Sequence, residues 1–434
     1  MTTGSPTGAA ETDSRAAAET AARESYGQLV ALLAGVSGDL ELAEDALAGA
    51  FEQALHTWPE RGVPANPTAW LFTTARNRLR DVWKSAAHRR TTALTAIVGA
   101  AEQQPDPSDP FDAIDPLAIP DRRLALLFVC AHPAIRSEVR TPLMLQTVLG
   151  IDSADIARVF AVPRAAMQQR LVRAKRRIRD ARIPFVVPDR TAIPERLPPV
   201  LEAIYGCCAL GREADDVAGP DSLLAEAHHL ALTLARLLDR EAEAWALAAL
   251  IAFARSRSVG SDGPYRPLAE QDPATWDADL IAAGDRCLRL ADRPGQPPGR
   301  FQLEAAIQAV HCARARTGRT DWPALRTLYA ALLTVAPSLG ARIAYAAVID
   351  RTEGPAQALE LLDQLPPEGD RLASFHATRA HLLERLDRPQ AAAAAYAAAA
   401  ERSAHRPSKA YLMDRRVALA ASTPPPEVSR SGPG

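Results

Sequence analysis

The chain has 434 residues, of which 47% are hydrophobic and only 5% aromatic, and its formal net charge is −2. This length predicts about two to four domains. Cores made of Ala, Leu and Val are typical of packed helices rather than sheets, so we predict an all-α fold. The sequence shows neither the basic start and apolar run of a secretory signal nor an uncharged apolar stretch of about 18 residues, as a transmembrane helix would need. Both absences predict a cytoplasmic protein with no membrane contact.

Composition and periodicity divide the chain into helical and irregular parts. The N-terminal residues are rich in Ala, Ser, Thr and Gly and show no periodic face, which is typical of a disordered tail. Helical periodicity then runs from about Arg23 to Ala86. Prolines among acidic residues follow and indicate a flexible linker, and a second helical block begins at Asp121. The predicted parts are a tail at 1–20, a helical module at 21–90, a linker at 91–120, a helical module at 121–184, a helical extension at 185–422 and a second tail at 423–434.

Two strongly basic segments stand out in this nearly neutral chain. Residues 164–182 carry eight basic side chains against one acid, and residues 76–90 carry six against one. A solvated charged face is the simplest explanation of either segment alone. Two such segments, each beside a structural motif, indicate a surface for a polyanion, because a Lys or Arg at a phosphate releases condensed counterions.

Residues 152–182 have the pattern of a helix-turn-helix. Asp152 or Ser153 can cap the first helix, and Ala161 and Val162 are expected to form the turn. Small and apolar residues occupy the positions where two helices meet at a steep angle, namely Ile156, Ala157, Phe160, Met167 and Leu171. Outward-facing Gln and Arg on the second helix can bind base edges and phosphates, and the candidates are Arg164, Gln168, Gln169, Arg173 and Arg176. The alternative is a basic amphipathic helix that docks on a protein or an acidic membrane.

The C-terminal part of the chain contains a period of 34 residues. Small residues recur at the first and third positions of the pattern, and a large apolar residue recurs at the fourth. The three sets are Cys312, Ala315, Ala324, Leu328 and Ala331; Ala346, Ile349, Ala358, Leu362 and Leu365; and Ala380, Leu383, Ala392, Tyr396 and Ala399. Close helix crossings at small residues are typical of tetratricopeptide (TPR) helix pairs, so we predict a TPR-like repeat. Before Cys312 the period fades.

Three segments resemble parts of a known family. In the helix-turn-helix the matching residues are Asp155, Ile156, Ala157, Pro163, Arg170, Leu171, Arg173, Ala174 and Lys175. Upstream, the matching stretches are LELAEDALAGAF at 40–51 and NPTAWLFTTARNRLRDVWK at 66–84. These resemble, in turn, region 4, the polymerase-gripping helix and the minus-10-melting segment of extracytoplasmic-function (ECF) sigma factors of bacterial RNA polymerase. Stretches at 121–135, 169–188 and 375–396 are similar to the subgroup with a long C-terminal helical extension.

The resemblance implies a sigma factor with a region 2 helical bundle, a region 4 helix-turn-helix and a fused regulatory extension. Its partners would be core RNA polymerase, double-stranded promoter DNA and the melted single strand. The groove of a TPR-like extension would take a protein or peptide, or the protein's own DNA-binding domains.

The resemblance also implies particular contact residues. It adds Arg170 and Lys175 to the minus-35 contacts. At the minus-10 element, an aromatic helix with Arg and Asn can stack flipped bases, and the candidates are Asn66, Trp70, Arg76, Asn77 and Arg80. Core positions for Trp70 and Phe72 are the alternative. The candidates for polymerase contact are Glu41, Glu44, Asp45 and Phe51. The chain departs from the family at Ala48-Gly49, where Gln-Glu or Gln-Asp is usual, and at Ala166, where Thr is usual.

Rival functions lack supporting motifs. The sequence contains no Gly-rich phosphate loop, HExxH or GxSxG, so we expect no catalytic residue and no cofactor. The five cysteines are expected to be buried thiols, and His132, two residues after Cys130, has no partners at ligand spacing, so no metal is expected. The second hypothesis is a regulator that binds DNA without polymerase, or a TPR-type scaffold. The helical module at 21–90 distinguishes a sigma factor from this second hypothesis, because a regulator or scaffold of that kind needs no segments that grip polymerase and melt DNA.

Overall fold

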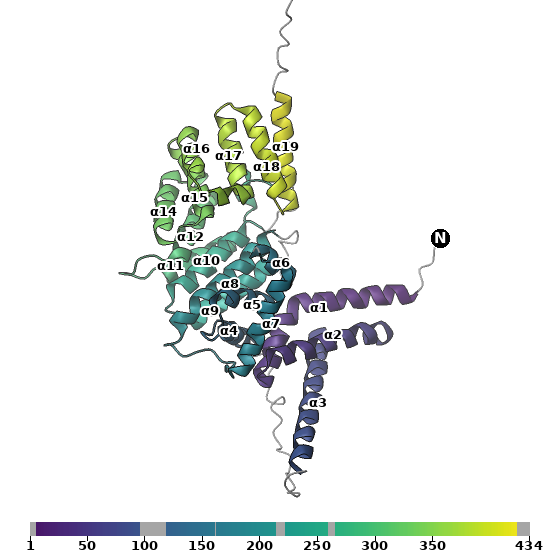
Figure 1. Ribbon diagram of the computed structural model, residues 1–434. Coiled ribbons are helices and arrows are strands. Elements are labelled where there is room, and N and C mark those ends of the chain that lie inside the picture. The colour runs from purple at the N-terminus through teal and green to yellow at the C-terminus, as the bar shows by residue number, and fades with distance from the viewer. Residues whose placement is uncertain (1–5, 96–118, 161, 214–221, 259–264, 423–434) are drawn as a thin grey trace, which may run out of the picture. The chain divides into compact units, whose positions relative to one another are not determined.

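The computed structural model describes residues 6–95, 119–160, 162–213, 222–258 and 265–422, and all its regular elements are helical (Figure 1). The all-α prediction is therefore confirmed. The chain forms two compact units, Met1–Cys207 and Cys208–Gly434. Among the described residues, no helix combines the length and apolar character needed to cross a bilayer.

The first unit opens with three helices: α1 (Pro6–Ser37), α2 (Leu40–Arg61) and α3 (Pro67–Thr95). The carboxylate of Asp39 caps α2 by accepting from the backbone N of Leu42 at 3.2 Å, a favoured capping arrangement. The side chain of Asn66 accepts from the backbone N of Ala69 at 3.0 Å, at the start of α3. The core of these helices is formed by Leu29, Leu33, Leu40, Leu47, Ala50, Leu71, Ala75 and Leu79.

The structure differs from the predicted tail and linker at their borders. Helix α1 already begins at Pro6, and Ser14, Ala18 and Ala21 are buried along it. Small side chains at these spacings form one helical face, although they carry little hydrophobic periodicity in the sequence. Helix α3 continues to Thr95, so only residues 96–118 of the predicted linker, and residues 1–5 and 423–434 of the predicted tails, lie outside the described residues.

Four helices follow in the first unit: α4 (Ile119–Cys130), α5 (Ser137–Thr147), α6 (Ser153–Val159) and α7 (Arg164–Asp180). Helices α6 and α7 pack together, and the Asp152 carboxylate caps α6 at 2.7 Å from the backbone N of Ala154. The expected inward residues Ile156, Ala157, Met167 and Leu171 are buried. The expectation for Phe160 is wrong, because α6 ends at Val159 and Phe160, as its C-cap, is 37% exposed. Ala161 lies outside the described residues.

The second unit is also a succession of helices, and α8 (Ile193–Glu213) spans the border between the units. Its longer helices are α9 (Leu223–Leu237), α10 (Ala242–Ser256), α11 (Ala278–Ala291), α12 (Arg300–Cys312), α14 (Trp322–Val335), α15 (Leu339–Thr352), α16 (Pro355–Asp363), α17 (Ala373–Arg385), α18 (Pro389–Arg402) and α19 (Arg406–Ser422). Short elements are α13 (Arg314–Thr317), η1 (Leu268–Glu270), η2 (Pro273–Thr275) and η3 (Pro367–Arg371).

A histidine links α9 to α10 in the second unit. His228 is 6% exposed, and its Nδ1 lies 2.7 Å from the Nη1 of Arg255, so the neutral ring accepts this hydrogen bond. Burial, followed by the nearby charge of Arg255, lowers the pKa of His228 from 6.5 to about 4. Burial likewise lowers the pKa of His311 in α12 to about 4.

The 34-residue period corresponds to pairs of helices. Helices α15 and α17 begin at Leu339 and Ala373, and α16 and α18 begin at Pro355 and Pro389, so both offsets are 34 residues. The repeated small and apolar residues of these two pairs share one buried cluster, against which Leu365 is partly buried. The set that starts at Cys312 is packed more loosely, because Ala315 in the short α13 is exposed.

Candidate nucleic-acid interface

Helix α7 presents the polar side chains expected of a DNA-reading helix. Pro163 is its N-cap, with φ −56°. Arg164, Gln168, Gln169 and Arg173 are exposed. The Nε2 of Gln168 donates to the Oγ of Ser153 at 3.4 Å, and the Nε of Arg173 donates to the carbonyl of Gln169 at 3.3 Å. These side chains therefore lie on an accessible face while the opposite face is buried.

An arginine-lined cavity adjoins this face. Arg170, Arg173 and Arg177 of α7 line a cavity of about 320 Å³ together with Arg136 and with apolar residues around α5. Arg136 is partly neutralised by Glu138 at 3.3 Å. Guanidinium groups gathered in this way suit a phosphate oxygen, to which they can donate several charge-assisted hydrogen bonds. Arg136 was not among the residues suggested by the sequence, because this residue precedes the helix-turn-helix. Only the packing of α5 on α7 brings Arg136 to the cavity.

The other edge of α7 is paired with acidic residues of α2. The Nζ of Lys175 donates to the Oε2 of Glu44 at 2.6 Å, and Lys175 is 8% exposed. Arg176 lies 3.6 Å from Glu41, and Arg179 lies 3.0 Å from Glu41. Burial raises the pKa of Glu44, while the charge of Lys175 opposes this rise. Lys175 and Arg176 are thus held by protein carboxylates, and Lys175 has little exposure to solvent.

The candidate polymerase contacts lie along α2. Glu41, Glu44 and Phe51 are half-buried, and Asp45 is exposed. The departure at Ala48-Gly49 has a structural reason on this helix. Ala48 is exposed, whereas Gly49 is buried where the guanidinium of Arg78 from α3 occupies the place of a β-carbon. The small residue therefore leaves room for the end of the Arg78 side chain against α2.

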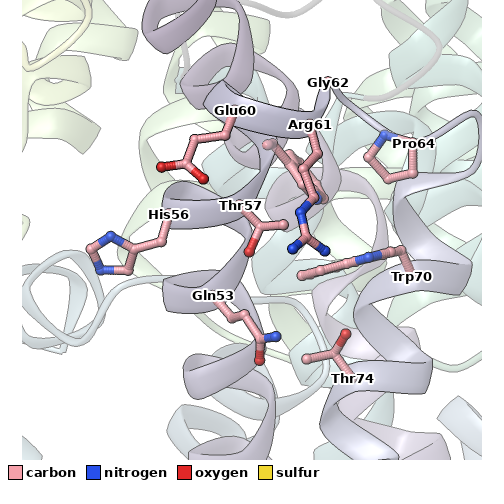
Figure 2. Close-up of a pocket in the computed structure, with 10 residues that line it drawn as sticks. Gln53, His56, Thr57, Glu60, Arg61, Gly62, Pro64, Trp70 and Thr74 are labelled. Atoms are coloured by element: carbon pink, nitrogen blue, oxygen red, sulfur yellow. The ribbon is translucent and has the colours of Figure 1, made fainter.

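A pocket of about 560 Å³ lies between the end of α2 and the start of α3 (Figure 2). The rings of Trp58 and Trp70 meet edge to face, with centroids 5.5 Å apart and an interplanar angle of 68°. Figure 2 shows Arg61, Trp70 and Thr74 directed into the same space. An exposed ring edge beside polar groups can stack a planar base and bind its polar edge.

The candidate minus-10 residues fall on two faces of α3. Trp70 is half-buried in the pocket, whereas Phe72 is 7% exposed and belongs to the core. Asn77 is exposed on the same face as Trp70, while Arg76 and Arg80 are half-buried on a neighbouring face. Asn66 caps the helix. Sequence reasoning missed Trp58 and Arg61, and the aromatic residue at position 58, close to the prolines of the connection, was the available indication.

The described residues do not show a metal site. No group of three or more His, Cys, Asp and Glu in this part of the chain is placed to hold an ion. The five cysteines, all among the described residues, are buried and form no disulfide. The Nδ1 of His132 accepts from the backbone N of Ala134 at 3.1 Å, and burial, followed by Arg196 and Arg140, lowers the pKa of His132. His132 therefore fixes a turn after α4.

Comparison with known proteins defines the family. Residues 22–89 match the model of sigma-70 region 2, and residues 196–292 match that of a family of unknown function, DUF6596. The chain is 34% identical over 393 residues to the uncharacterized protein R00370 of Rhizobium meliloti, which covers 88% of this chain and 91% of that protein.

Two more distant relatives are named as RNA polymerase sigma factors. A probable RNA polymerase sigma factor, RfaY, of Xanthomonas campestris pv. campestris is 28% identical over 169 residues, 36% of this chain and 40% of that protein. The ECF RNA polymerase sigma factor SigL of Mycobacterium tuberculosis is 32% identical over 148 residues, 33% of this chain and 76% of that protein. No solved structure matches the chain. The chain belongs to the same family as R00370, and its region 2 match together with its similarity to SigL makes it a member of the sigma-70 family.

Proposed function

We propose that this protein is an ECF-type sigma factor, which binds core RNA polymerase and directs promoter-specific initiation, and that its C-terminal unit is a fused TPR-like regulatory module. The observation that carries the proposal is the presence, in one compact unit, of a region 2 match and a helix-turn-helix with an exposed Gln- and Arg-bearing face. A regulator that acts without polymerase has no use for region 2.

At the minus-35 element, α7 would enter the major groove of the DNA. Arg164, Gln168 and Gln169 in its first half are exposed and can donate to base edges. Arg170 and Arg173 face the arginine-lined cavity and would hold a backbone phosphate. Base contacts then specify the sequence, while phosphate contacts fix the register of the helix.

At the minus-10 element, the pocket beside α3 would receive an unstacked base. Trp70 offers a ring edge that Trp58 supports from inside the fold, and Arg61 offers donors to the base or to its phosphate. Trapping a flipped base stabilises the melted strand, because base–aromatic stacking contributes about 1–3 kcal/mol. Asn77, Arg76 and Arg80 would then follow the strand along α3.

Helix α2 would provide the polymerase contact, with Asp45 and its acidic neighbours beside the apolar Phe51. The C-terminal helix pairs would provide a groove for a protein or peptide, or for the protein's own DNA-binding domains. The match of residues 196–292 to a family of unknown function shows that part of this unit recurs in other proteins.

Run-off transcription tests the proposal. Purified chain and core polymerase are incubated with fragments from upstream of genes in the source genome, and a promoter-specific transcript is expected. A variant with Trp70→Ala should lose transcription from duplex templates. If the chain binds duplex DNA but yields no specific transcript, it is a regulator that does not use polymerase.

A further inference from the structure

An irregular segment of the second unit lies against helices that are far away in the sequence. It comprises residues 265–276, whose only regular elements are the short turns η1 and η2, and we call it the bridging segment. Arg314 of α13 binds Leu268 across 46 residues of sequence, and Tyr411 of α19 binds Glu270 across 141 residues. The bridging segment therefore connects the first set of the 34-residue repeat with α19.

Arg314 binds the main chain of the bridging segment. Its Nη2 donates to the carbonyl oxygens of Leu268 and Gln271 at 2.9 and 2.7 Å, and its Nη1 donates to that of Ala269 at 3.2 Å. Its guanidinium also lies over the ring of Trp276, 5.0 Å from the centroid, where a cation is attracted to the ring face. Bonds to three carbonyls depend on the path of the chain and not on its side chains, as in the main-chain recognition of bound peptides.

Two residues at the start of α19 supply contacts to side chains of the bridging segment. The ring of Tyr265 meets the rings of His405 and Tyr411 edge to face, with centroids 5.8 and 5.7 Å apart. The hydroxyl of Tyr411 donates to the Oε1 of Glu270 at 2.8 Å, a charge-assisted hydrogen bond. We call Arg314, His405 and Tyr411 the receptor face. Its contacts select an aromatic residue and a carboxylate five positions apart.

The first half of the bridging segment is held less firmly than its end. Tyr265 and Glu270 are exposed, whereas Trp276 is 7% exposed. The Oε1 of Gln271 and the Nε of Arg314 are buried without a hydrogen-bond partner among the described residues, and unsatisfied buried polar atoms are costly. A stretch with few buried side chains opens at a low cost in free energy. The first half can therefore leave the receptor face while Trp276 stays in the fold.

We propose that the receptor face is a peptide-binding site, which residues 265–271 occupy in the free chain and from which a partner protein displaces them. The partner presents a loop or tail with an aromatic residue five positions before a carboxylate. The proposal rests on the proposed function and deepens it, because it gives the regulatory C-terminal unit a partner of defined chemistry. A tethered occupant has an effective concentration of about millimolar, so the partner must bind better than the built-in segment.

The test measures binding of a fluorescent peptide to the full chain by anisotropy. The peptide has the sequence of residues 265–271, and a scrambled peptide of the same composition is its control. Tyr265→Ala with Glu270→Gln removes side-chain contacts of the built-in segment and leaves the receptor face intact. Arg266→Ala is the matched control in the same segment, because its exposed side chain forms no hydrogen bond or ion pair within the described residues.

We expect the double variant to bind the peptide about tenfold more tightly than the native chain and the Arg266→Ala chain, because its own segment competes less. Adding Tyr411→Phe to the double variant should weaken binding about threefold or more, since this change removes the donor to the peptide carboxylate. Equal affinities of the double variant and the Arg266→Ala chain, or equal binding of the scrambled peptide, would overturn the proposal.

A second measurement follows the built-in segment directly. Spin labels are placed by Ala269→Cys in the segment and Met413→Cys on α19, both at exposed positions, while the native cysteines are buried. Saturating peptide should lengthen the separation between the labels. An unchanged separation at saturation would show that the peptide binds elsewhere, which contradicts the proposal. Neither experiment uses polymerase or DNA, so peptide displacement in a chain that gives no specific transcript would support the peptide site and count only against the sigma function.

Discussion

Gly27 in α1 lies so close to the carbonyl oxygen of Val148, which ends α5, that a β-carbon at position 27 would overlap that oxygen. The contact joins α1 to α5, the helix that precedes the helix-turn-helix and packs on α7. A backbone carbonyl has little freedom to move aside, so the close approach depends on the absence of a side chain.

We expect Gly27→Ala to destabilise the first unit by about 1–3 kcal/mol, the usual cost of overpacking. Amide hydrogen exchange in α1 and α5 measures the effect. Gly49→Ala is the matched control, because its β-carbon meets only the mobile end of Arg78. Alanine gains up to about 1 kcal/mol of helix propensity over glycine, so we expect the control to be neutral or stabilising. Equal protection in both variants would contradict the overpacking argument.

The arginine-lined cavity should contribute to the salt dependence of DNA binding. We expect Arg170→Ala and Arg177→Ala each to weaken duplex binding and to reduce the slope of log affinity against log salt by about 0.9, the value for one phosphate contact. Fluorescence anisotropy at several salt concentrations provides the measurement. Arg190→Ala, an exposed position outside the cavity, is the control, and an identical slope change there would show that only overall charge matters.

The pocket between α2 and α3 should discriminate single-stranded from double-stranded DNA. We expect Trp70→Ala to weaken binding of a single-stranded minus-10 oligonucleotide by about 5- to 150-fold, equivalent to about 1–3 kcal/mol of stacking, with duplex binding nearly unchanged. Trp70→Phe keeps an aromatic face and should retain most of the affinity. Parallel losses on both kinds of DNA would instead indicate misfolding around α3.

Acid should destabilise the second unit through its buried histidines. The folded-state pKa of His228 is lowered to about 4 from 6.5, so between these values the folded unit binds fewer protons than the unfolded one. The stability that this group contributes is complete above about pH 6.5 and is lost as the pH falls toward 4. The loss for His228 is up to about 3 kcal/mol. Calorimetry of the full chain across this pH range measures it.

A variant with His228→Asn keeps an acceptor for Arg255 and removes the titrating ring, so its acid sensitivity should be smaller. Some sensitivity should remain, because the pKa of His311 is also lowered. His229→Gln, at the exposed neighbouring position, should behave like the native chain. If the His228 variant lost stability more steeply than the native chain as the pH falls, groups other than His228 would dominate the acid sensitivity.

The sequence was informative wherever structure depends on near neighbours. The Asp152 cap, the buried face of α7 and the 34-residue spacing of the last helix pairs follow from local capping and periodicity. Phe160 was misjudged because α6 ends one residue before it, and helix ends are decided by packing as much as by pattern. The start of α1 was missed because an Ala-rich face carries little hydrophobic contrast.

The parts of the site that depend on distant residues were beyond sequence reasoning. Nothing near Lys175 in the sequence indicates Glu44, so the lysine was interpreted as a DNA contact when the structure holds it in an ion pair. Arg136 enters the arginine-lined cavity only through the packing of α5, and Trp58 supports Trp70 only because α2 and α3 meet at their connection.

The packing of the last helices predicts how the lengths of related chains can differ. Helix α18 lies between α17 and α19, and Leu412 of α19 completes the buried cluster of the last two pairs. Loss of α19 would uncover an alanine-rich face and favour association with other molecules. Insertion of a further helix pair ahead of α19 would keep every buried face covered. Relatives should therefore differ in length by whole pairs, with the final helix retained as an end cap.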